Sequence, residues 1–198
     1  MNVSIEDIKK LKELSGIGLT DAKVALVEAD GDFDKALGVL RKKGLTKAEK
    51  KGDREAREGL IDSYVHSGRI GVIVEVNCET DFVARLDNFK EFAHHIAMQI
   101  AAMSPVYVSE EDIPADELTR VRTEALERVK SEGKPAEIAE KIVDGQVKKY
   151  FEEKVLLNQA YIMDDTKKVS DFVKENIAQV GENIIIRQFK RIELGVSE

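Results

Sequence analysis

The chain has 198 residues, a formal net charge of −7 and one cysteine, Cys78. A chain of this length buries roughly 70% of its unfolded surface, so it can build a core without cross-links. The negative charge argues against general nucleic-acid binding, and a single cysteine excludes an intrachain disulfide. No apolar run approaches a membrane span and no basic-then-apolar leader follows Met1, so we expect a soluble protein of the cytoplasm.

Residues 1–45 have the pattern of three short helices, the first two separated at Gly16-Ile17-Gly18. Asp32 is the predicted N-cap of the third helix, and Gly44 its predicted end. The apolar residues predicted to face inward are Ile5, Ile8 and Leu11, then Ala22, Ala25, Leu26 and Ala29, then Phe33, Ala36, Leu37 and Leu40. This pattern resembles the ubiquitin-associated fold, a small helical binding module.

A basic segment follows the predicted helices. Residues 41–57 contain eight Lys or Arg and three Asp or Glu, with few large apolar residues. Such charge runs are usually solvated connectors, so we predict a linker at 46–57 between the helical domain and a core domain at 58–198. An RNA contact is the alternative, but no aromatic residues are interleaved with the charges.

The core domain begins with two strand-like runs, 59–66 and 69–77, on either side of Ser67-Gly68. That dipeptide is a tight-turn signal. A third strand-like run, 183–193, is rich in isoleucine. Helical patterns occupy the residues between them. We therefore predict an α+β fold, with a three-stranded antiparallel sheet covered by helices on one face.

Residues 116–155 are charged and helical, with a break at Gly133-Lys134-Pro135. This pattern predicts a projecting antiparallel helical hairpin, and a plain helical layer over the sheet is the alternative. The residues predicted to face one another are Val121, Leu126 and Val129 on one arm, and Ile138, Ile142, Tyr150 and Phe151 on the other.

The most informative stretch is 78–85, which connects a strand to a helix. Such connections normally carry polar turn residues, yet this one contains Asp81-Phe82. Phe82 has the helical spacing of a buried face with the apolar residues that follow it. However, Asn88 and Glu91 have the layout of a capping box, and a helix that starts there leaves Phe82 on a separate turn. Phe82 as a core residue and Phe82 as an exposed binding anchor both remain open.

Residues 76–84, Val-Asn-Cys-Glu-Thr-Asp-Phe-Val-Ala, resemble the signature of the elongation factor Ts family. Further blocks resemble that family in the same order along the chain: residues 12–23, 28–32, 133–141 and 181–184. Together the blocks span nearly the whole chain. The resemblance implies a guanine-nucleotide exchange factor that binds GDP-bound elongation factor Tu, disturbs its Mg²⁺ and phosphate contacts and promotes GDP release.

The resemblance also implies which residues contact the partner. Phe82 would insert between two helices of the GTPase domain near the Mg²⁺ site, while Asp81 would bond polar groups of the partner and Val83 would support the ring. Thr80 completes this set of partner-binding residues. Further contacts would come from Leu19, Thr20, His66 and Val180. Core packing is the alternative role for Val180, and a plain turn position is the alternative for His66.

Long members of the family have two related core subdomains, whereas this chain has one. It resembles the short members, in which two chains pair so that two half-cores complete each other. A three-stranded sheet with an apolar edge favours such pairing. We therefore expect a homodimer.

Catalytic chemistry is not expected. An enzyme would have to combine Cys78 with His94 or His95 and Asp81, but nothing in the spacing brings these groups together. Adjacent histidines on a helix point in different directions and cannot jointly bind one metal ion. No phosphate-loop motif is present, so we expect neither a cofactor nor a nucleotide site in the chain itself. The alternative function is a ubiquitin-associated-like binding scaffold without exchange activity.

Overall fold

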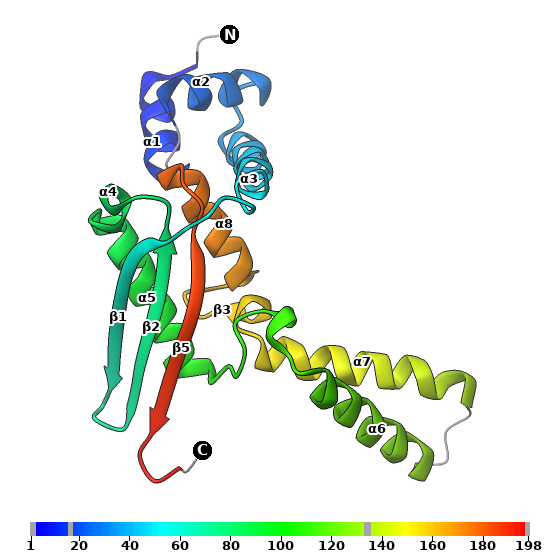
Figure 1. Ribbon diagram of the computed structural model, residues 1–198. Coiled ribbons are helices and arrows are strands. Elements are labelled where there is room, and N and C mark those ends of the chain that lie inside the picture. Colours follow the sequence, from blue (N-terminus) through cyan, green and yellow to red (C-terminus); the bar gives the residue numbers. More distant parts are fainter. Residues whose placement is uncertain (1–2, 16–17, 133–135, 197–198) are drawn as a thin grey trace. The chain divides into compact units, whose positions relative to one another are not determined.

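The computed structural model describes residues 3–15, 18–132 and 136–196 (Figure 1). The predicted breaks at Gly16-Ile17 and at Gly133-Lys134-Pro135 lie outside the described residues. The chain divides into two compact units, which comprise Met1–Asp62, Glu75–His94 and Asp171–Arg187 in the first, and Ser63–Val74, His95–Ser170 and Gln188–Glu198 in the second. In the described part of the chain, no helix combines the length and the apolar composition needed to cross a membrane.

The sheet has three antiparallel strands in the order β1-β2-β5 (Figure 1). The strands are β1 (Glu58–His66), β2 (Ile70–Cys78) and β5 (Ile185–Glu193). Ser67 and Gly68 both have positive φ, 48° and 66°, and the Arg69 amide donates to the His66 carbonyl at 2.9 Å. The predicted tight turn and the α+β fold class are therefore confirmed.

The first unit contains three N-terminal helices: α1 (Ile5–Ser15), α2 (Leu19–Glu28) and α3 (Phe33–Glu49). Asp32 caps α3 as predicted, because its carboxylate accepts from the Lys35 amide at 3.0 Å. One predicted core position is wrong, since Ile5 is 71% exposed. The buried residues are Leu11, Ala22, Ala25, Leu26, Ala29, Ala36 and Leu40.

The third helix does not end at Gly44, as the sequence predicted, but continues to Glu49. A Cβ atom added to Gly44 would lie 3.3 Å from the Cβ of Ala178 on α8 (Val169–Val180). The glycine therefore permits close approach of two helices rather than terminating one. Consequently, residues 46–49 of the predicted linker are helical.

The first unit also contains the short helix α4 (Asp81–Ala84) and the beginning of α5 (Asp87–Met103). Aromatic side chains pack α5 against α8 in this unit. The Phe92 ring lies 6.4 Å from that of Phe89 and 5.1 Å from that of Phe172, between centroids. Both Phe89 and Phe92 are buried, so this stretch of α5 belongs to the core.

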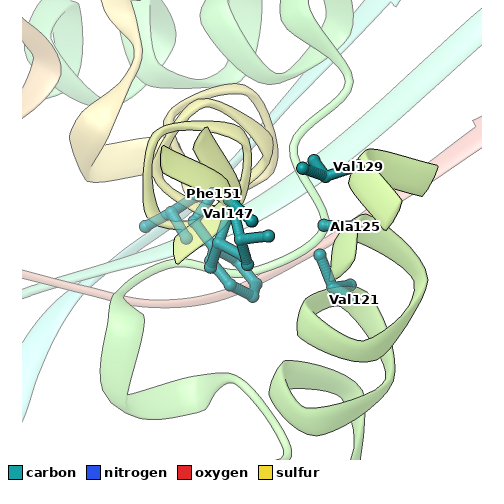
Figure 2. Packing of buried hydrophobic residues seen from close by; sticks show 8 residues of the cluster. Val121, Ala125, Val129, Val147 and Phe151 are labelled. Atoms are coloured by element: carbon teal, nitrogen blue, oxygen red, sulfur yellow. The ribbon is translucent and has the colours of Figure 1, made fainter. Parts of the chain in front are cut away.

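The second unit contains the helical pair α6 (Ala115–Ser131) and α7 (Ala136–Lys154), which confirms the predicted hairpin (Figure 1). Their contact is an apolar cluster (Figure 2) made of Val121, Ala125, Val129, Ala139, Val143, Val147, Phe151 and Val155. Ile138 is 52% exposed, contrary to prediction, because the neighbouring Ala139 takes the inward position on α7.

Hydrogen bonds fix the base of the hairpin. Tyr107 forms an isolated parallel bridge with Val155, and the Glu117 carboxylate accepts from the hydroxyls of Tyr107 and Tyr150. The hydrogen bond to Glu117 raises the pKa of Tyr107 to about 12. The remaining elements of this unit are the 3-10 turns η1 (Glu110–Asp112) and η2 (Leu156–Asn158) and the hairpin of β3 (Ala160–Tyr161) with β4 (Asp164–Lys168).

Candidate functional site

Phe82 lies on a turn of its own between β2 and α5. We call residues 79–86 the Phe82 turn. Within it, Thr80 is the N-cap of α4 and its hydroxyl accepts from the Val83 amide at 3.4 Å. Phe82 is 77% exposed, whereas Val83 beside it is 7% exposed. The alternative of Phe82 as a core residue is therefore wrong, and Val83 anchors the turn instead.

The predicted capping box at Asn88 is also wrong. Helix α5 begins one residue earlier, at Asp87, so Asn88 lies in its first turn. The Leu86 carbonyl accepts from the amides of Phe89 and Lys90, both at 3.1 Å. The local pattern nevertheless separated Phe82 correctly from the helix that follows.

Asp81 points to solvent beside Phe82. Its carboxylate pairs with the Arg85 guanidinium at 2.7 Å, four residues further along. Both side chains are substantially exposed, and exposed ion pairs of this kind contribute little to stability. Asp81 can therefore exchange Arg85 for a polar group of a partner without disturbing the fold.

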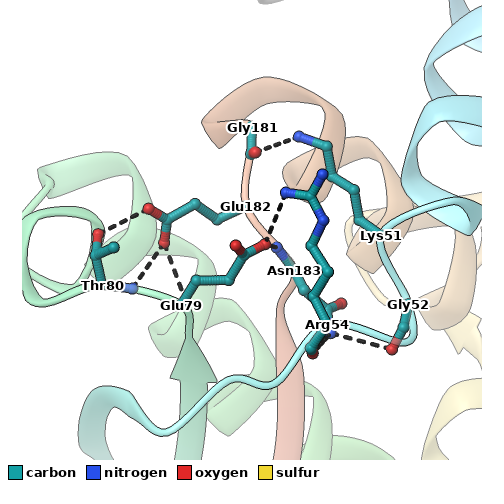
Figure 3. Close-up of polar contacts among 8 residues, drawn as sticks. All are labelled: Lys51, Gly52, Arg54, Glu79, Thr80, Gly181, Glu182 and Asn183. Atoms are coloured by element: carbon teal, nitrogen blue, oxygen red, sulfur yellow. Dashed lines mark hydrogen bonds and ion pairs between the residues drawn. The ribbon is translucent and has the colours of Figure 1, made fainter.

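The most connected side chain at the site is one to which the sequence assigned no role, Glu182, which lies between α8 and β5 (Figure 3). One carboxylate oxygen accepts from the backbone amides of Glu79 and Thr80, at 3.1 and 3.0 Å. The other accepts from the Thr80 hydroxyl at 2.7 Å. The only sequence signal for Glu182 was its place in the block 181–184.

Glu79 and Asn183 extend these contacts. The Glu79 carboxylate accepts from the Asn183 amide at 2.7 Å and lies 3.5 Å from the Arg54 guanidinium. The Asn183 side chain donates to the carbonyls of Gly52 and Arg54, at 3.1 and 2.7 Å (Figure 3). We call Glu79, Thr80, Glu182 and Asn183 the Glu182 cluster. Its members come from two segments that are far apart in the sequence, and it binds a third segment at Gly52 and Arg54.

The other predicted contact residues lie on different elements. Leu19 and Thr20 are exposed at the start of α2. His66 is exposed at the end of β1, with its Nδ1 atom 3.0 Å from the Tyr64 hydroxyl. Val180, the last residue of α8, is half-buried and precedes the segment that carries Glu182. Of these four, only Val180 is thus adjacent to the Glu182 cluster in the chain.

Comparison with known proteins decides the family. The family described as Elongation factor TS matches residues 47–196. The elongation factor Ts of Thermotoga petrophila is 52% identical over 196 residues, covering 98% of each chain. Those of Fervidobacterium nodosum and Thermoanaerobacter sp. are 48% and 50% identical, covering 98% of this chain and 100% and 95% of their own. The chain belongs to the elongation factor Ts family.

Elongation factor Ts is the guanine-nucleotide exchange factor of elongation factor Tu in translation elongation, and it is not an enzyme. It is a soluble factor of the bacterial cytoplasm. The resemblance seen in the sequence motifs is therefore confirmed along with the exchange function.

The two adjacent histidines of this chain have structural neighbours. The Nδ1 atom of His94 lies 2.9 Å from the Asp62 carboxylate, and that of His95 lies 2.9 Å from the Tyr161 hydroxyl. Across the described residues, no group of three or more His, Cys, Asp or Glu side chains has the arrangement of a metal site.

Cys78 should be a slow nucleophile. Its thiol is buried and donates to the Thr80 carbonyl at 3.1 Å, and burial raises its pKa to about 11. We expect iodoacetamide at pH 8 to alkylate the native protein at least ~10-fold more slowly than the urea-unfolded chain, as mass spectrometry would measure.

The raised pKa of Cys78 also makes the free energy of unfolding depend on pH. The buried neutral thiol contributes fully to stability below its ordinary pKa of 9.0, and this contribution is lost as the pH rises toward 11.

The control for this prediction is Cys78→Ala, which should accelerate nucleotide exchange as well as the parent protein does. Rapid alkylation of the native protein, together with loss of activity in Cys78→Ala, would contradict the structural role of this thiol.

Proposed function

We propose that this chain releases GDP from elongation factor Tu by inserting Phe82 beside the Mg²⁺ site of the GTPase domain. The observation that supports this role is the 77% exposure of Phe82 next to residues held by hydrogen bonds. A large aromatic side chain on a rigid support is a typical interface anchor. Because the Phe82 side chain is exposed, it is not needed for the core of the free protein.

Burial of one phenylalanine side chain would supply part of the free energy needed to weaken GDP binding. A GTPase holds GDP through its phosphate loop and a Mg²⁺ ion that bridges to the phosphates. Burial of a phenylalanine side chain contributes about 1.5–3 kcal/mol, or one to two orders of magnitude in an equilibrium constant. Because linkage is reciprocal, the factor weakens GDP binding by the same ratio by which GDP weakens binding of the factor.

The neighbours of Phe82 have separate proposed roles. Val83 anchors the turn in the core, and Thr80 caps α4 and binds Glu182. Asp81 would accept hydrogen bonds from the partner and orient the phenylalanine ring. The Mg²⁺ ion and the nucleotide belong to the partner in this proposal, so the chain needs no cofactor of its own.

Additional contacts with the GTPase would come from Leu19 and Thr20 on α2 and from His66 and Val180. The first three are exposed, and Val180 is half-buried. We retain as a proposal the division into a helical domain (1–45), a connector (46–57) and a core domain (58–198). The helical domain would then supply a second attachment point besides the Phe82 turn.

We also propose that two copies of the chain pair through the sheet. Ile73 on β2 is exposed between the buried Val72 and Val74, so its face of the strand is uncovered. Val65 on β1 and Ile192 on β5 are also exposed apolar residues in the second unit. Apolar surface of this kind is typical of a protein–protein interface.

The substitution Ile73→Lys should shift the protein from dimer to folded monomer, because it places a charge on the proposed interface. Light scattering after gel filtration should give twice the 22.1 kDa chain mass for the parent protein and the single mass for the variant. Met163→Lys, at an exposed position in the β3–β4 turn, is the matched control and should remain dimeric. A parent protein that is monomeric throughout a dilution series would refute the pairing.

Release of a fluorescent GDP analogue from elongation factor Tu, in the presence of excess unlabelled GDP, tests the exchange function. Substoichiometric amounts of the chain should accelerate release, because the factor dissociates and acts again. Binding without acceleration would instead favour the scaffold function. If the chain neither binds elongation factor Tu nor accelerates release, both the exchange function and the scaffold function are refuted.

A further inference from the structure

We infer that Glu182 is a positioning residue for nucleotide exchange, whose carboxylate holds the Phe82 turn in the orientation that the partner receives. This inference rests on the proposed insertion of Phe82. It adds a residue that touches neither the partner nor the nucleotide and acts through the turn.

The Phe82 turn needs an external support. Helix α4 has four residues, a single turn, and a helix that short is not stable by itself. The Phe82 side chain is mostly exposed and therefore contributes little packing that would fix the turn. Val83 supplies one anchor in the core, and the Cys78 thiol and the Ala84 amide donate to the Thr80 carbonyl. None of these contacts binds the backbone amides of Glu79 and Thr80.

Glu182 supplies the missing support at that start. Its carboxylate gathers three donors from two consecutive residues: the amides of Glu79 and Thr80 and the Thr80 hydroxyl. Hydrogen bonds to an ionised acceptor are roughly twice as strong as neutral ones. The Thr80 hydroxyl in turn accepts from the Val83 amide, so the chain of contacts runs from Glu182 into α4.

Glu182 is itself held in place. Gly181 adopts a positive φ of 80°, and its amide donates to the Ile177 carbonyl at 3.0 Å, which ends α8 and turns the chain toward β5. The Gly181 carbonyl accepts from the Lys51 ammonium group, and Asn183 on the other side binds Glu79 (Figure 3). A carboxylate fixed on both flanks can impose its position on the turn that it binds.

The consequence for exchange is preorganisation. If the turn were mobile, part of the free energy of inserting Phe82 would be lost in ordering residues 79–83 at each encounter. With the carboxylate in place, the turn is ordered before the partner arrives. Glu182 should therefore affect exchange only as long as Phe82 is there to be positioned.

A double-mutant cycle tests this dependence. We expect Glu182→Ala to lower stimulated GDP release about 10-fold, because three donors lose their acceptor. Glu182→Gln keeps a carbonyl oxygen for the two backbone amides, so its rate of stimulated GDP release should lie within about 3-fold of the parent rate. In the Phe82→Ala background, adding Glu182→Ala should lower release by less than about 2-fold. Glu127→Ala, an exposed acid on α6, is the charge-matched control and should be unchanged.

Amide hydrogen exchange gives the local readout. The amides of Glu79, Thr80 and Val83 should exchange faster in Glu182→Ala, whereas those in the middle of α5 should keep their protection. If Glu182→Ala does not fold, Thr80→Val replaces it in the cycle, since it removes the 2.7 Å hydroxyl contact with Glu182.

The possible outcomes are distinct. An equal loss on adding Glu182→Ala in the presence and absence of Phe82 would overturn the positioning role and indicate a general structural one. So would a fully active Glu182→Ala alongside an inactive Phe82→Ala. An active Phe82→Ala would instead refute the proposed insertion itself, whatever Glu182 does.

Discussion

Replacing Phe82 by alanine should lower stimulated GDP release by about one to two orders of magnitude and leave the protein folded. The loss follows from the 1.5–3 kcal/mol that burial of a phenylalanine side chain contributes. The fold should be unaffected because the ring is 77% exposed, and such surface substitutions change stability by about 0.5 kcal/mol or less. Stopped-flow release of a fluorescent GDP analogue measures the first effect, and urea unfolding the second.

Two variants sharpen this experiment. Phe82→Leu keeps part of the apolar surface and should give an intermediate rate. Met163→Ala removes another exposed apolar side chain, from the β3–β4 turn, and should leave the rate unchanged. If Phe82→Ala stimulates release fully while its circular dichroism matches that of the parent protein, Phe82 is not the inserting residue.

Phe92→Ala should have the opposite profile, with a loss of about 3–5 kcal/mol in the free energy of unfolding. Phe92 is 1% exposed, and its ring packs between those of Phe89 and Phe172. Truncation would leave a cavity at that contact. Since small domains are stable by only about 5–15 kcal/mol, the urea midpoint should fall sharply.

Phe82→Ala serves as the matched control for Phe92→Ala, because the same atoms are deleted ten residues away on the surface. A loss below about 1 kcal/mol in Phe92→Ala would show that this part of α5 is not a rigid core. Any reduced exchange activity of Phe92→Ala should recover at low temperature or low urea, where the variant is folded.

Several features could be predicted from the sequence because they depend on neighbouring residues. The Ser67-Gly68 turn requires two residues that tolerate positive φ, and both have it. Asp32 caps α3 through an amide three residues away. The charged, periodic pattern of residues 116–155 predicted two helices that pack together. The turn and cap hydrogen bonds join residues three positions apart, and the two packed helices follow one another directly in the chain.

The predictions that failed depended on distant partners. Gly44 looks like a helix end, but a nearby residue of α8 makes glycine useful inside α3. Ile138 has the spacing of an inward residue, yet the neighbouring Ala139 takes that place in the α6–α7 contact. The β3–β4 hairpin was not predicted, since β3 has only two residues and β4 has the polar sequence Asp-Asp-Thr-Lys-Lys.

The sequence by itself determined the fold class, the family and the separation of Phe82 from α5, because these follow from short-range patterns and from motifs in order. Only the tertiary structure decided that Phe82 is exposed while Val83 is buried, since both are apolar residues that could occupy a core. It alone revealed Glu182, whose contact with Thr80 joins residues 102 positions apart. The sequence around a glutamate does not indicate which distant amides its carboxylate will bind, because only folding brings them together.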